Sequence, residues 1–359
     1  MTDRILEFRS DTFTKPTPAM RRAMAEAEVG DDQYGEDPTV ARLEQRSAQV
    51  VGKEAAVFVP SGMMGNLCGV LSQAERGEEV VLGDLAHIYQ NEMGAFAMLG
   101  GLHGRIVPNG EGLPSLNDLA AAIRPQGGPF PRTALVCLEN SHNGCGGSVI
   151  TPEETRAVAD LAHRHGAKVH LDGARVFNAA VALGVDPAAL CEPVDTVQFC
   201  FSKGLAAPVG SILCGSAETV AKARRVRKVL GGAMRQSGII AAAALVALET
   251  MRDRLAEDHA NAKALAEGLA AVRGIRIDPG RIVTNIVSFE VDPAAMDAGA
   301  FQRACAERGL RVSRYFGNSP RLRMLTHNDV GRADVDAALT VVAGVLASVR
   351  RPTGVAAGG

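Results

Sequence analysis

The stretch Thr196–Ser211, TVQFCFSKGLAAPVGS, decides the fold. Its apolar run leads directly into Ser202-Lys203-Gly204, and a short loop then precedes a second apolar run. Nearly continuous apolar runs of this length are typical of strands that are buried on both faces. The stretch therefore predicts a buried strand that ends at a polar loop, which is where open α/β sheets bind ligands.

Other apolar runs of the same kind alternate with helix signals along the chain. They are Ala55–Val59, Glu79–Leu82, Arg105–Val107, Ala134–Leu138, Lys168–Leu171 and Ser211–Cys214. Asp37-Pro38 and Thr151-Pro152 each combine an N-cap residue with proline at the first helical position. The alternation predicts an α/β protein whose large domain holds a mainly parallel seven-stranded sheet.

The pattern changes after about residue 240, which predicts a second, smaller domain. Residues 239–272 are rich in Ala, Leu and Glu, as in one or two long helices, and a mixture of strands and helices follows. We expect an N-terminal segment, 1–35, that packs on the large domain or on a partner subunit. We further expect a large domain at 36–240, a long helix with a small α+β domain at 241–350, and a disordered tail at 351–359.

Composition excludes several function classes. The 38 basic and 40 acidic residues give a net charge of −2, which argues against a general nucleic-acid binder. The longest apolar run, Gly238–Leu248, is shorter than the ~20 residues that span a bilayer, and the N-terminus shows no secretory signal. The 7 cysteines form no C-x-x-C pair, which favours free thiols in the cytoplasm over a disulfide framework or zinc site. We expect a cytoplasmic protein with no membrane, nucleic-acid or metal partner.

Lys203 has the sequence context of a nucleophilic amine. An ammonium that is partly desolvated at the end of a buried strand has a lowered pKa and can attack an aldehyde to form a Schiff base. For any single lysine, a surface or snorkelling role is the commoner explanation. Asp172, in KVHLDGAR (168–175), also ends an apolar run, so both side chains are expected at one edge of the sheet. Together they suit a pyridine cofactor, since the carboxylate can hold the ring nitrogen protonated while the lysine holds the aldehyde.

A glycine-bearing turn, PSGMMGN (60–66), separates the strand Ala55–Val59 from a helix. Backbone N–H groups at such a helix start form an anion site that suits a phosphate. The sequence contains neither G-x-G-x-x-G nor a Walker A lysine pattern, so a nucleotide is not indicated.

Longer motifs then extend over nearly the whole chain. They are RSDT (9–12), VGDDQYGEDPTV, GKEAAVFVPSG, AH (86–87), ENSHNG, HLDGARVFNA, FSKGLAAPVGS, GGAMRQSGI and RLRMLTH. In these motifs the chain resembles low-specificity L-threonine aldolases, enzymes of the beta-eliminating lyase/threonine aldolase family with the aspartate-aminotransferase fold (fold type I). The resemblance implies pyridoxal 5′-phosphate (PLP) as cofactor. It also implies retro-aldol cleavage of L-threonine, L-allo-threonine and related β-hydroxy-α-amino acids such as phenylserine to glycine and an aldehyde.

The resemblance assigns the catalytic roles to four residues. Lys203 would carry the cofactor aldehyde, and Asp172 would pair with the ring nitrogen. His87 would stack on the ring and help to take the β-hydroxyl proton, with His142 nearby.

The resemblance also implies the substrate contacts. Ser10, Arg175 and Arg323 match the family's contacts to the substrate carboxylate and the cofactor hydroxyl, a task for which the forked guanidinium is suited. Tyr89, and Tyr34 from a partner chain, would shape the pocket around the substrate Cβ.

The phosphate contacts implied by the resemblance come from two places. Gly62 and the N–H of Met63 would hold the phosphate, while Lys228 and Arg235 of a neighbouring subunit would bring positive charge to it. The resemblance also implies a homodimer-based homotetramer with shared active sites. Many relatives carry Thr where this chain has Met63, so one hydroxyl donor is lost and we expect weaker cofactor retention.

Two other interpretations stay open at the level of sequence. One is a different fold-type I enzyme, such as a β-eliminating lyase or a transaminase, and the other is a PLP-binding protein without catalysis. The preferred amino acid, its threo or erythro selectivity and the choice between dimer and tetramer also stay open.

Overall fold

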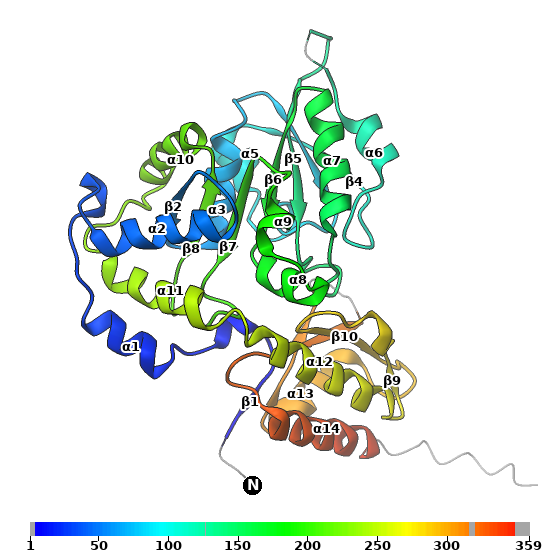
Figure 1. The fold of residues 1–359 in the computed structure, drawn as a ribbon. Coiled ribbons are helices and arrows are strands. Elements are labelled where there is room, and N and C mark those ends of the chain that lie inside the picture. The colour runs from blue at the N-terminus through cyan, green and yellow to red at the C-terminus, as the bar shows by residue number, and fades with distance from the viewer. Residues whose placement is uncertain (1–3, 126, 316–319, 349–359) are drawn as a thin grey trace, which may run out of the picture. The chain divides into compact units, whose positions relative to one another are not determined.

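The computed structural model describes residues 4–125, 127–315 and 320–348, which fall into two compact units (Figure 1). The large unit is Thr14–Ala256, and the small unit combines Met1–Phe13 with Glu257–Gly359.

This division differs from the expected ranges at both ends of the large domain. Residues up to Phe13 join the small unit because β1 (Leu6–Glu7) pairs in parallel with β11 (Leu310–Arg311). Helix α11 (Gly238–Thr250) belongs to the large unit, where it packs against α1 and α2, and the expected tail 351–359 lies outside the described residues.

The large unit is built on a seven-stranded sheet with the order β2-β8-β7-β6-β5-β3-β4. Strand β8 runs antiparallel to both of its neighbours, while the pairs among β7, β6, β5, β3 and β4 are parallel. The predicted mainly parallel seven-stranded sheet is therefore confirmed. The strands are β2 (Ala55–Val59), β3 (Glu79–Gly83), β4 (His103–Val107), β5 (Thr133–Glu139), β6 (Lys168–Asp172), β7 (Thr196–Cys200) and β8 (Ser211–Gly215).

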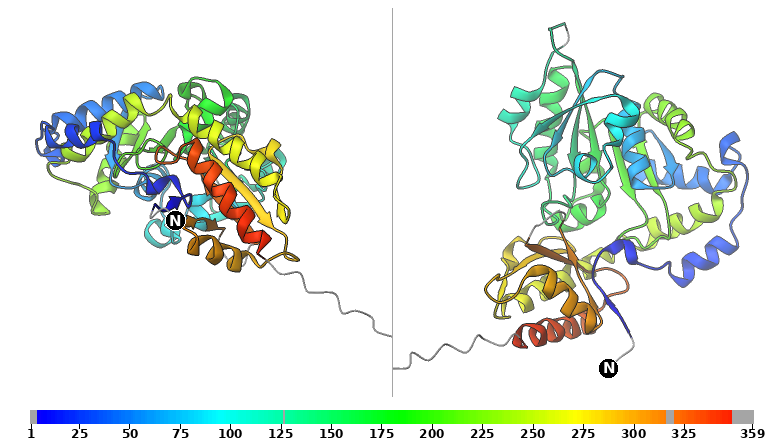
Figure 2. Two further views of the ribbon diagram at one scale, coloured as in Figure 1. Left: turned by 90° about the horizontal axis from the view of Figure 1, so that it is seen from below. Right: turned by 180° about the vertical axis from the view of Figure 1, so that it is seen from behind.

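Helices cover both faces of this sheet, as Figures 1 and 2 show. On β5, Val136 and Leu138 enter one apolar core, whereas Leu135 and Cys137 enter another on the opposite face. Successive side chains of a strand point to opposite faces, so a strand between two cores must be apolar throughout. This is why the predicted strands appear as unbroken apolar runs.

The helices of the large unit begin at strong capping signals. Asp37 accepts hydrogen bonds from the backbone N–H groups of Thr39 and Val40, and Thr151 forms a capping box with Glu154. The helices are α1 (Pro18–Ala25), α2 (Pro38–Val50), α3 (Gly62–Leu71), α4 (His87–Gln90), α5 (Ala95–Gly100), α6 (Leu116–Ala122), α7 (Pro152–Arg164), α8 (Val176–Leu183), α9 (Pro187–Cys191), α10 (Ala217–Val229) and α11, with 3₁₀ turn η2 at Asp32–Tyr34. Helix α12 (Leu255–Ala270) follows at the division between the units.

The small unit is an α+β structure with its own core. A four-stranded sheet with the order β12-β13-β10-β9 places Val287, Phe289, Leu322 and Met324 against the helices. Its elements are η1 (Asp11–Phe13), β9 (Ile275–Arg276), η3 (Pro279–Arg281), β10 (Ile286–Val291), α13 (Ala298–Glu307), β12 (Ser313–Arg314), β13 (Arg321–Leu325) and α14 (Arg332–Ala347), besides β1, β11 and α12. The expected small α+β unit is thus present.

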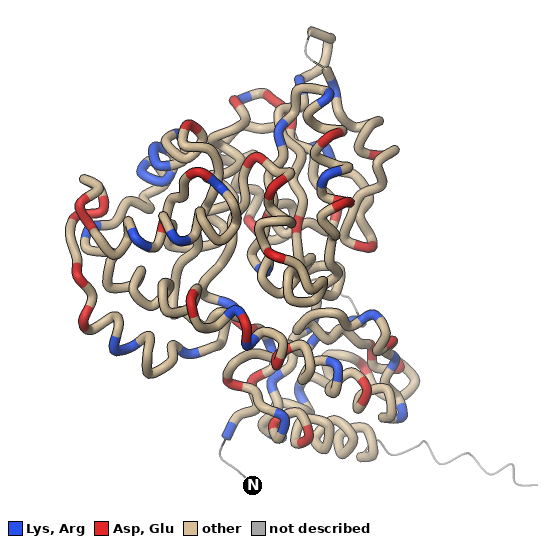
Figure 3. The backbone as a smooth tube through the Cα atoms, in the orientation of Figure 1, with Lys and Arg blue, Asp and Glu red and all other residues tan. Residues whose placement is uncertain are grey.

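Charged residues of both signs are interspersed along the chain, with a basic group on α10 (Figure 3). Among the described residues, we found no helix with the length and apolar character needed to cross a membrane.

Candidate active site

Polar side chains gather at the carboxyl ends of the parallel strands of the large unit. Asp172 is the last residue of β6, its Cα partner on β5 is Glu139, and Lys203 follows β7. His87 opens α4 in the connection that follows β3. Because these strands are parallel, their carboxyl ends lie at one edge of the sheet, where α/β proteins bind ligands.

Asp172 is the electrostatic centre of this edge. The side chain is buried, and burial alone would raise the pKa of its carboxyl. The positive charges of His87 and Lys203, together with hydrogen bonds from Asn66 and from the backbone N–H of Ala174, outweigh burial and lower the pKa. Asp172 is therefore a buried carboxylate whose negative charge interacts with the positive charges of His87 and Lys203.

Asn66 reaches Asp172 because α3 lies unusually close to the sheet. A Cβ added at Gly65 would come within 2.6 Å of Gln198 Cγ, and one added at Gly69 within 2.5 Å of His170 Cε1. Real Cβ atoms do not approach so closely, so these glycines permit the contact. The Asn66 Nδ2 group then lies 2.8 Å from Asp172 Oδ2.

His87 is paired with a buried acid that sequence analysis did not single out. Its Nδ1 lies 2.9 Å from Glu92 Oε1, and its backbone N–H donates to Glu139 Oε2 at 2.7 Å. Burial alone would lower the pKa of His87, but the hydrogen bond to Glu92 and the negative charges of Asp172 and Glu139 raise it overall. Burial raises the pKa of Glu92. The pair can therefore hold a proton beside the sheet edge.

His142 is fully buried in the loop that follows β5. Its Nε2 lies 2.9 Å from the Nδ2 donor of Asn109, whose Oδ1 already accepts the N–H of Leu85 at 2.9 Å. Nε2 is therefore the hydrogen-bond acceptor, which leaves the ring proton on Nδ1. Among the residues that the structure describes, the buried Nδ1 has no hydrogen-bond partner.

Arg175 and Lys203 are held by loops next to these residues. The Arg175 side chain is buried at the start of α8, and its Nη1 donates to Asn143 Oδ1 at 3.3 Å. The backbone oxygen of Lys203 accepts from Thr14 Oγ1 at 3.1 Å, which fixes the loop after β7. Both residues are thus positioned at the same strand ends as Asp172.

The start of α3 presents backbone N–H groups that the helix itself cannot pair. The first N–H groups of an α-helix have no partner within the helix, and Ser61 Oγ accepts that of Met64 at 3.2 Å, which leaves those of Gly62 and Met63 outside the helix hydrogen bonds. A Cβ at Gly62 would lie 2.7 Å from Cys200 Sγ, so glycine allows the helix to begin against β7. Met63 is 38% exposed. This helix start provides N–H groups for an anion.

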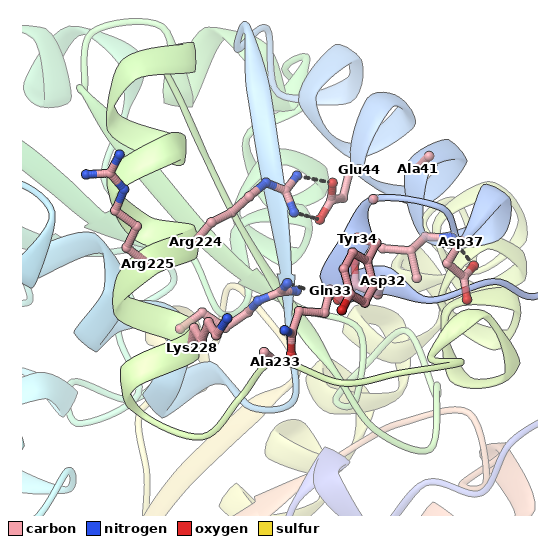
Figure 4. Close-up of a pocket in the computed structure, with 13 residues that line it drawn as sticks. Asp32, Gln33, Tyr34, Asp37, Ala41, Glu44, Arg224, Arg225, Lys228 and Ala233 are labelled. Atoms are coloured by element: carbon pink, nitrogen blue, oxygen red, sulfur yellow. Dashed lines mark hydrogen bonds and ion pairs between the residues drawn. The ribbon is translucent and has the colours of Figure 1, made fainter.

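Lys228 and Tyr34 line a different cavity, of about 570 Å³, beside α10 and η2 (Figure 4). Arg227 lies in its wall with Nη2 2.9 Å from Asp32 Oδ2, and Arg224 pairs with Glu44. Arg235, the other basic residue assigned to the phosphate, forms an ion pair with Asp31 at 2.9 Å. Among the described residues of the chain, these three lie apart from the group around Asp172, and their assigned roles remain predictions.

Ser10 and Arg323 belong to the small unit, and their assigned roles also remain predictions. Ser10 Oγ accepts from Thr12 Oγ1 at 2.9 Å. Arg323 lies on β13, where its guanidinium is 5.5 Å from the centre of the Tyr315 ring. In the large unit, Tyr89 lies on α4 and is 40% exposed.

His87, Glu92 and Asp172 offer ligand atoms within 4.8 Å of one another, a spacing that a metal ion could use. Asn66 Nδ2 donates to Glu92 Oε1 at 2.7 Å and to Asp172 Oδ2 at 2.8 Å. These hydrogen bonds account for the closeness of the two carboxylates.

Comparison with known proteins identifies the family of this chain. The sequence profile of the family described as beta-eliminating lyase matches residues 7–292. This chain belongs to that family. The low-specificity L-threonine aldolase 1 of Arabidopsis thaliana is 46% identical over 358 residues, which cover 98% of this chain and 99% of the relative. The predicted family resemblance and the assignment of the chain as a lyase are thereby confirmed.

Solved structures support the fold of this lyase. A threonine aldolase from Leishmania major aligns with a TM-score of 0.80 at 19% identity, covering 94% of this chain and 99% of the other. A structure of SPT with PLP aligns with a TM-score of 0.74 at 20% identity, covering 96% and 87%. The predicted α/β fold class is confirmed.

Sequence analysis missed the polar residues that support the predicted site: Asn66, Glu92, Asn109, Glu139 and His170. A signal was present for the first of them. The glycines of GMMGNLCG (62–69) fall on one face of a helix, which indicates close approach to a neighbouring element. Asn66 lies on the same face and is thereby brought to the sheet.

Proposed function

We propose that this lyase is a low-specificity L-threonine aldolase that uses PLP to cleave L-threonine, L-allo-threonine and related β-hydroxy-α-amino acids to glycine and an aldehyde. The observation that carries the proposal is the buried Asp172 carboxylate with Lys203 and His87 beside it. The relative from Arabidopsis thaliana, similar over nearly its full length, is named for this activity.

The residues present fit the cofactor. Lys203 would hold its aldehyde, Asp172 its ring nitrogen, and the N–H groups of Gly62 and Met63 its phosphate. The charged state of Asp172 is what a protonated pyridine ring requires. When bound, PLP withdraws electrons from the substrate Cα so that the bond to Cβ can break.

The chain's own groups would bind the amino acid and move its proton. Arg175 would hold the substrate carboxylate through charge-assisted hydrogen bonds, and the resemblance assigns contacts to the substrate or cofactor to Ser10 and Arg323 as well. In its neutral form, with the Nδ1–H directed at Glu92, His87 would accept the β-hydroxyl proton at Nε2. His142 would support this step from the buried loop after β5.

The assembly belongs to the proposal as well. Lys228, Arg235 and Tyr34 lie away from Asp172 within one chain, so we propose a homodimer-based tetramer in which they complete a neighbouring subunit's site. We also propose that the enzyme works in the cytoplasm, in line with its free cysteines, all but one of which are buried.

A product assay tests the activity. Purified protein loaded with PLP is incubated with L-threonine, L-allo-threonine and phenylserine, and the products are identified. Glycine with the matching aldehyde is the expected result. A 2-oxo acid with ammonia would instead support β-elimination, and bound cofactor without release of glycine from any of these substrates would support a non-catalytic PLP-binding protein.

A further inference from the structure

A line of polar side chains runs from the half-buried Gln73 through the buried Thr196 and His170 to Asn66, which contacts Asp172. The directions of its hydrogen bonds follow from its two ends. It begins at Gln73, whose Nε2 amide donates to Gly69 O at 3.0 Å and to Thr196 Oγ1 at 2.7 Å. Since Thr196 Oγ1 accepts this bond, its hydroxyl proton is available to His170 Nδ1, 2.8 Å away.

His170 connects Thr196 to Asn66 through its two ring nitrogens. The ring is fully buried, and burial lowers its pKa to about 4, so it is neutral at physiological pH. A neutral ring that accepts at Nδ1 must carry its proton on Nε2. Nε2 lies 3.2 Å from Asn66 Oδ1, and it can donate only if that atom is the amide oxygen.

Asn66 therefore has its nitrogen on the other side, facing two acids. Nδ2 is 2.8 Å from Asp172 Oδ2 and 2.7 Å from Glu92 Oε1, so each amide proton serves one carboxylate. An inverted amide would place its oxygen against both carboxylates, which would leave buried acceptors facing one another. Glu92 in turn bonds His87 Nδ1 at 2.9 Å.

We propose that Asn66 is a positioning residue, locked in one amide orientation by the line Gln73–Thr196–His170, that sets Asp172 and the Glu92–His87 pair for their tasks through one N–H each. The orientation of Asn66 stands on the hydrogen-bond geometry of the chain itself. Its kinetic consequence rests on the proposed aldolase function.

The first test is a nuclear magnetic resonance measurement on the protein without cofactor. Histidine labelled with ¹⁵N should show His170 neutral with its proton on Nε2 at pH 7. The Asn66 side-chain NH₂ pair, identified by its loss in Asn66→Leu, should be protected from solvent exchange. A proton on Nδ1 of His170, or an imidazolium at pH 7, would overturn the proposal.

A pair of variants separates orientation from packing. In His170→Gln the new amide can accept from Thr196 and donate to Asn66, whereas His170→Leu can do neither. The protected NH₂ pair should persist in His170→Gln and disappear in His170→Leu. In the loaded enzyme, His170→Leu should lower kcat about 10- to 100-fold with KM changed less than about threefold, and His170→Gln should restore most of kcat.

Thr155→Val is the control for replacing a buried polar side chain with an apolar one outside this line, since the buried Thr155 hydroxyl, on α7, donates to the backbone oxygen of Thr151. Thr155→Val should leave the protection of the Asn66 NH₂ pair and kcat as in the parent. Equal protection of the NH₂ pair in His170→Leu and in the parent would overturn the proposal. If the loaded parent enzyme releases no glycine, the aldolase function fails while the resonance test still decides the orientation of Asn66.

Discussion

Buried His170 should make the stability of the large unit fall steeply in mild acid. Its pKa is lowered by burial from 6.5 to about 4 in the folded protein. Between these values the unfolded chain takes up a proton that the native state does not, so the free energy of unfolding decreases as the pH falls. From pH 7 to pH 5 the difference amounts to about 2 kcal/mol for this one group.

The assay is urea unfolding of the cofactor-free protein at pH 7 and pH 5, compared with His170→Gln. The variant has no titrating ring, so it should lose about 2 kcal/mol less than the parent between the two pH values, whatever its stability at pH 7. Val169→Ala, a buried neighbour on β6 without a titratable group, should lose stability at both pH values and keep the parent's pH dependence. Equal pH dependence in the parent and His170→Gln would refute the reasoning.

Gly69→Ala should destabilise the protein by about 1–3 kcal/mol in the same assay, because its Cβ would lie 2.5 Å from the His170 ring. Gly344→Ala, in α14, meets only the flexible end of an arginine at 3.0 Å, so it should be neutral or stabilise by up to about 1 kcal/mol. Met63→Thr should tighten PLP binding by adding a hydroxyl donor at the start of α3, and an unchanged Kd would mean that the hydroxyl is irrelevant here. Asp172→Ala should lower turnover by orders of magnitude with the fold intact by circular dichroism, and near-normal activity would contradict its role at the ring nitrogen.

Much of the fold could be predicted because its signals are local. Strands covered on both faces produce unbroken apolar runs, and the helix starts at Asp37 and Thr151 depend on side chains within three residues. The pairing of β1 with β11 joins distant parts of the chain and has no local signal. Because of this pairing, the first 13 residues belong to the small unit, whereas the expected N-terminal segment covered residues 1–35.

Some residues of the candidate site have a local sequence signal, and others do not. Lys203 and Asp172 could be placed because each lies where an apolar strand ends, at the same sheet edge, whereas His87 was assigned through the motifs of the family resemblance. Asn66 and Glu92 could not, because Asn66 meets Asp172 across 106 positions of sequence through the close packing of α3. Polar residues of this kind look like ordinary helix or loop positions until the packing is known.

The central claim is that the Lys203 side-chain nitrogen binds the PLP aldehyde. Protein loaded with PLP is reduced with borohydride, digested, and its peptides are weighed by mass spectrometry. The peptide that contains Lys203 should carry the reduced cofactor, and Lys203→Ala should yield no labelled peptide. An unlabelled Lys203 peptide, or label on another lysine in both proteins, would contradict the account.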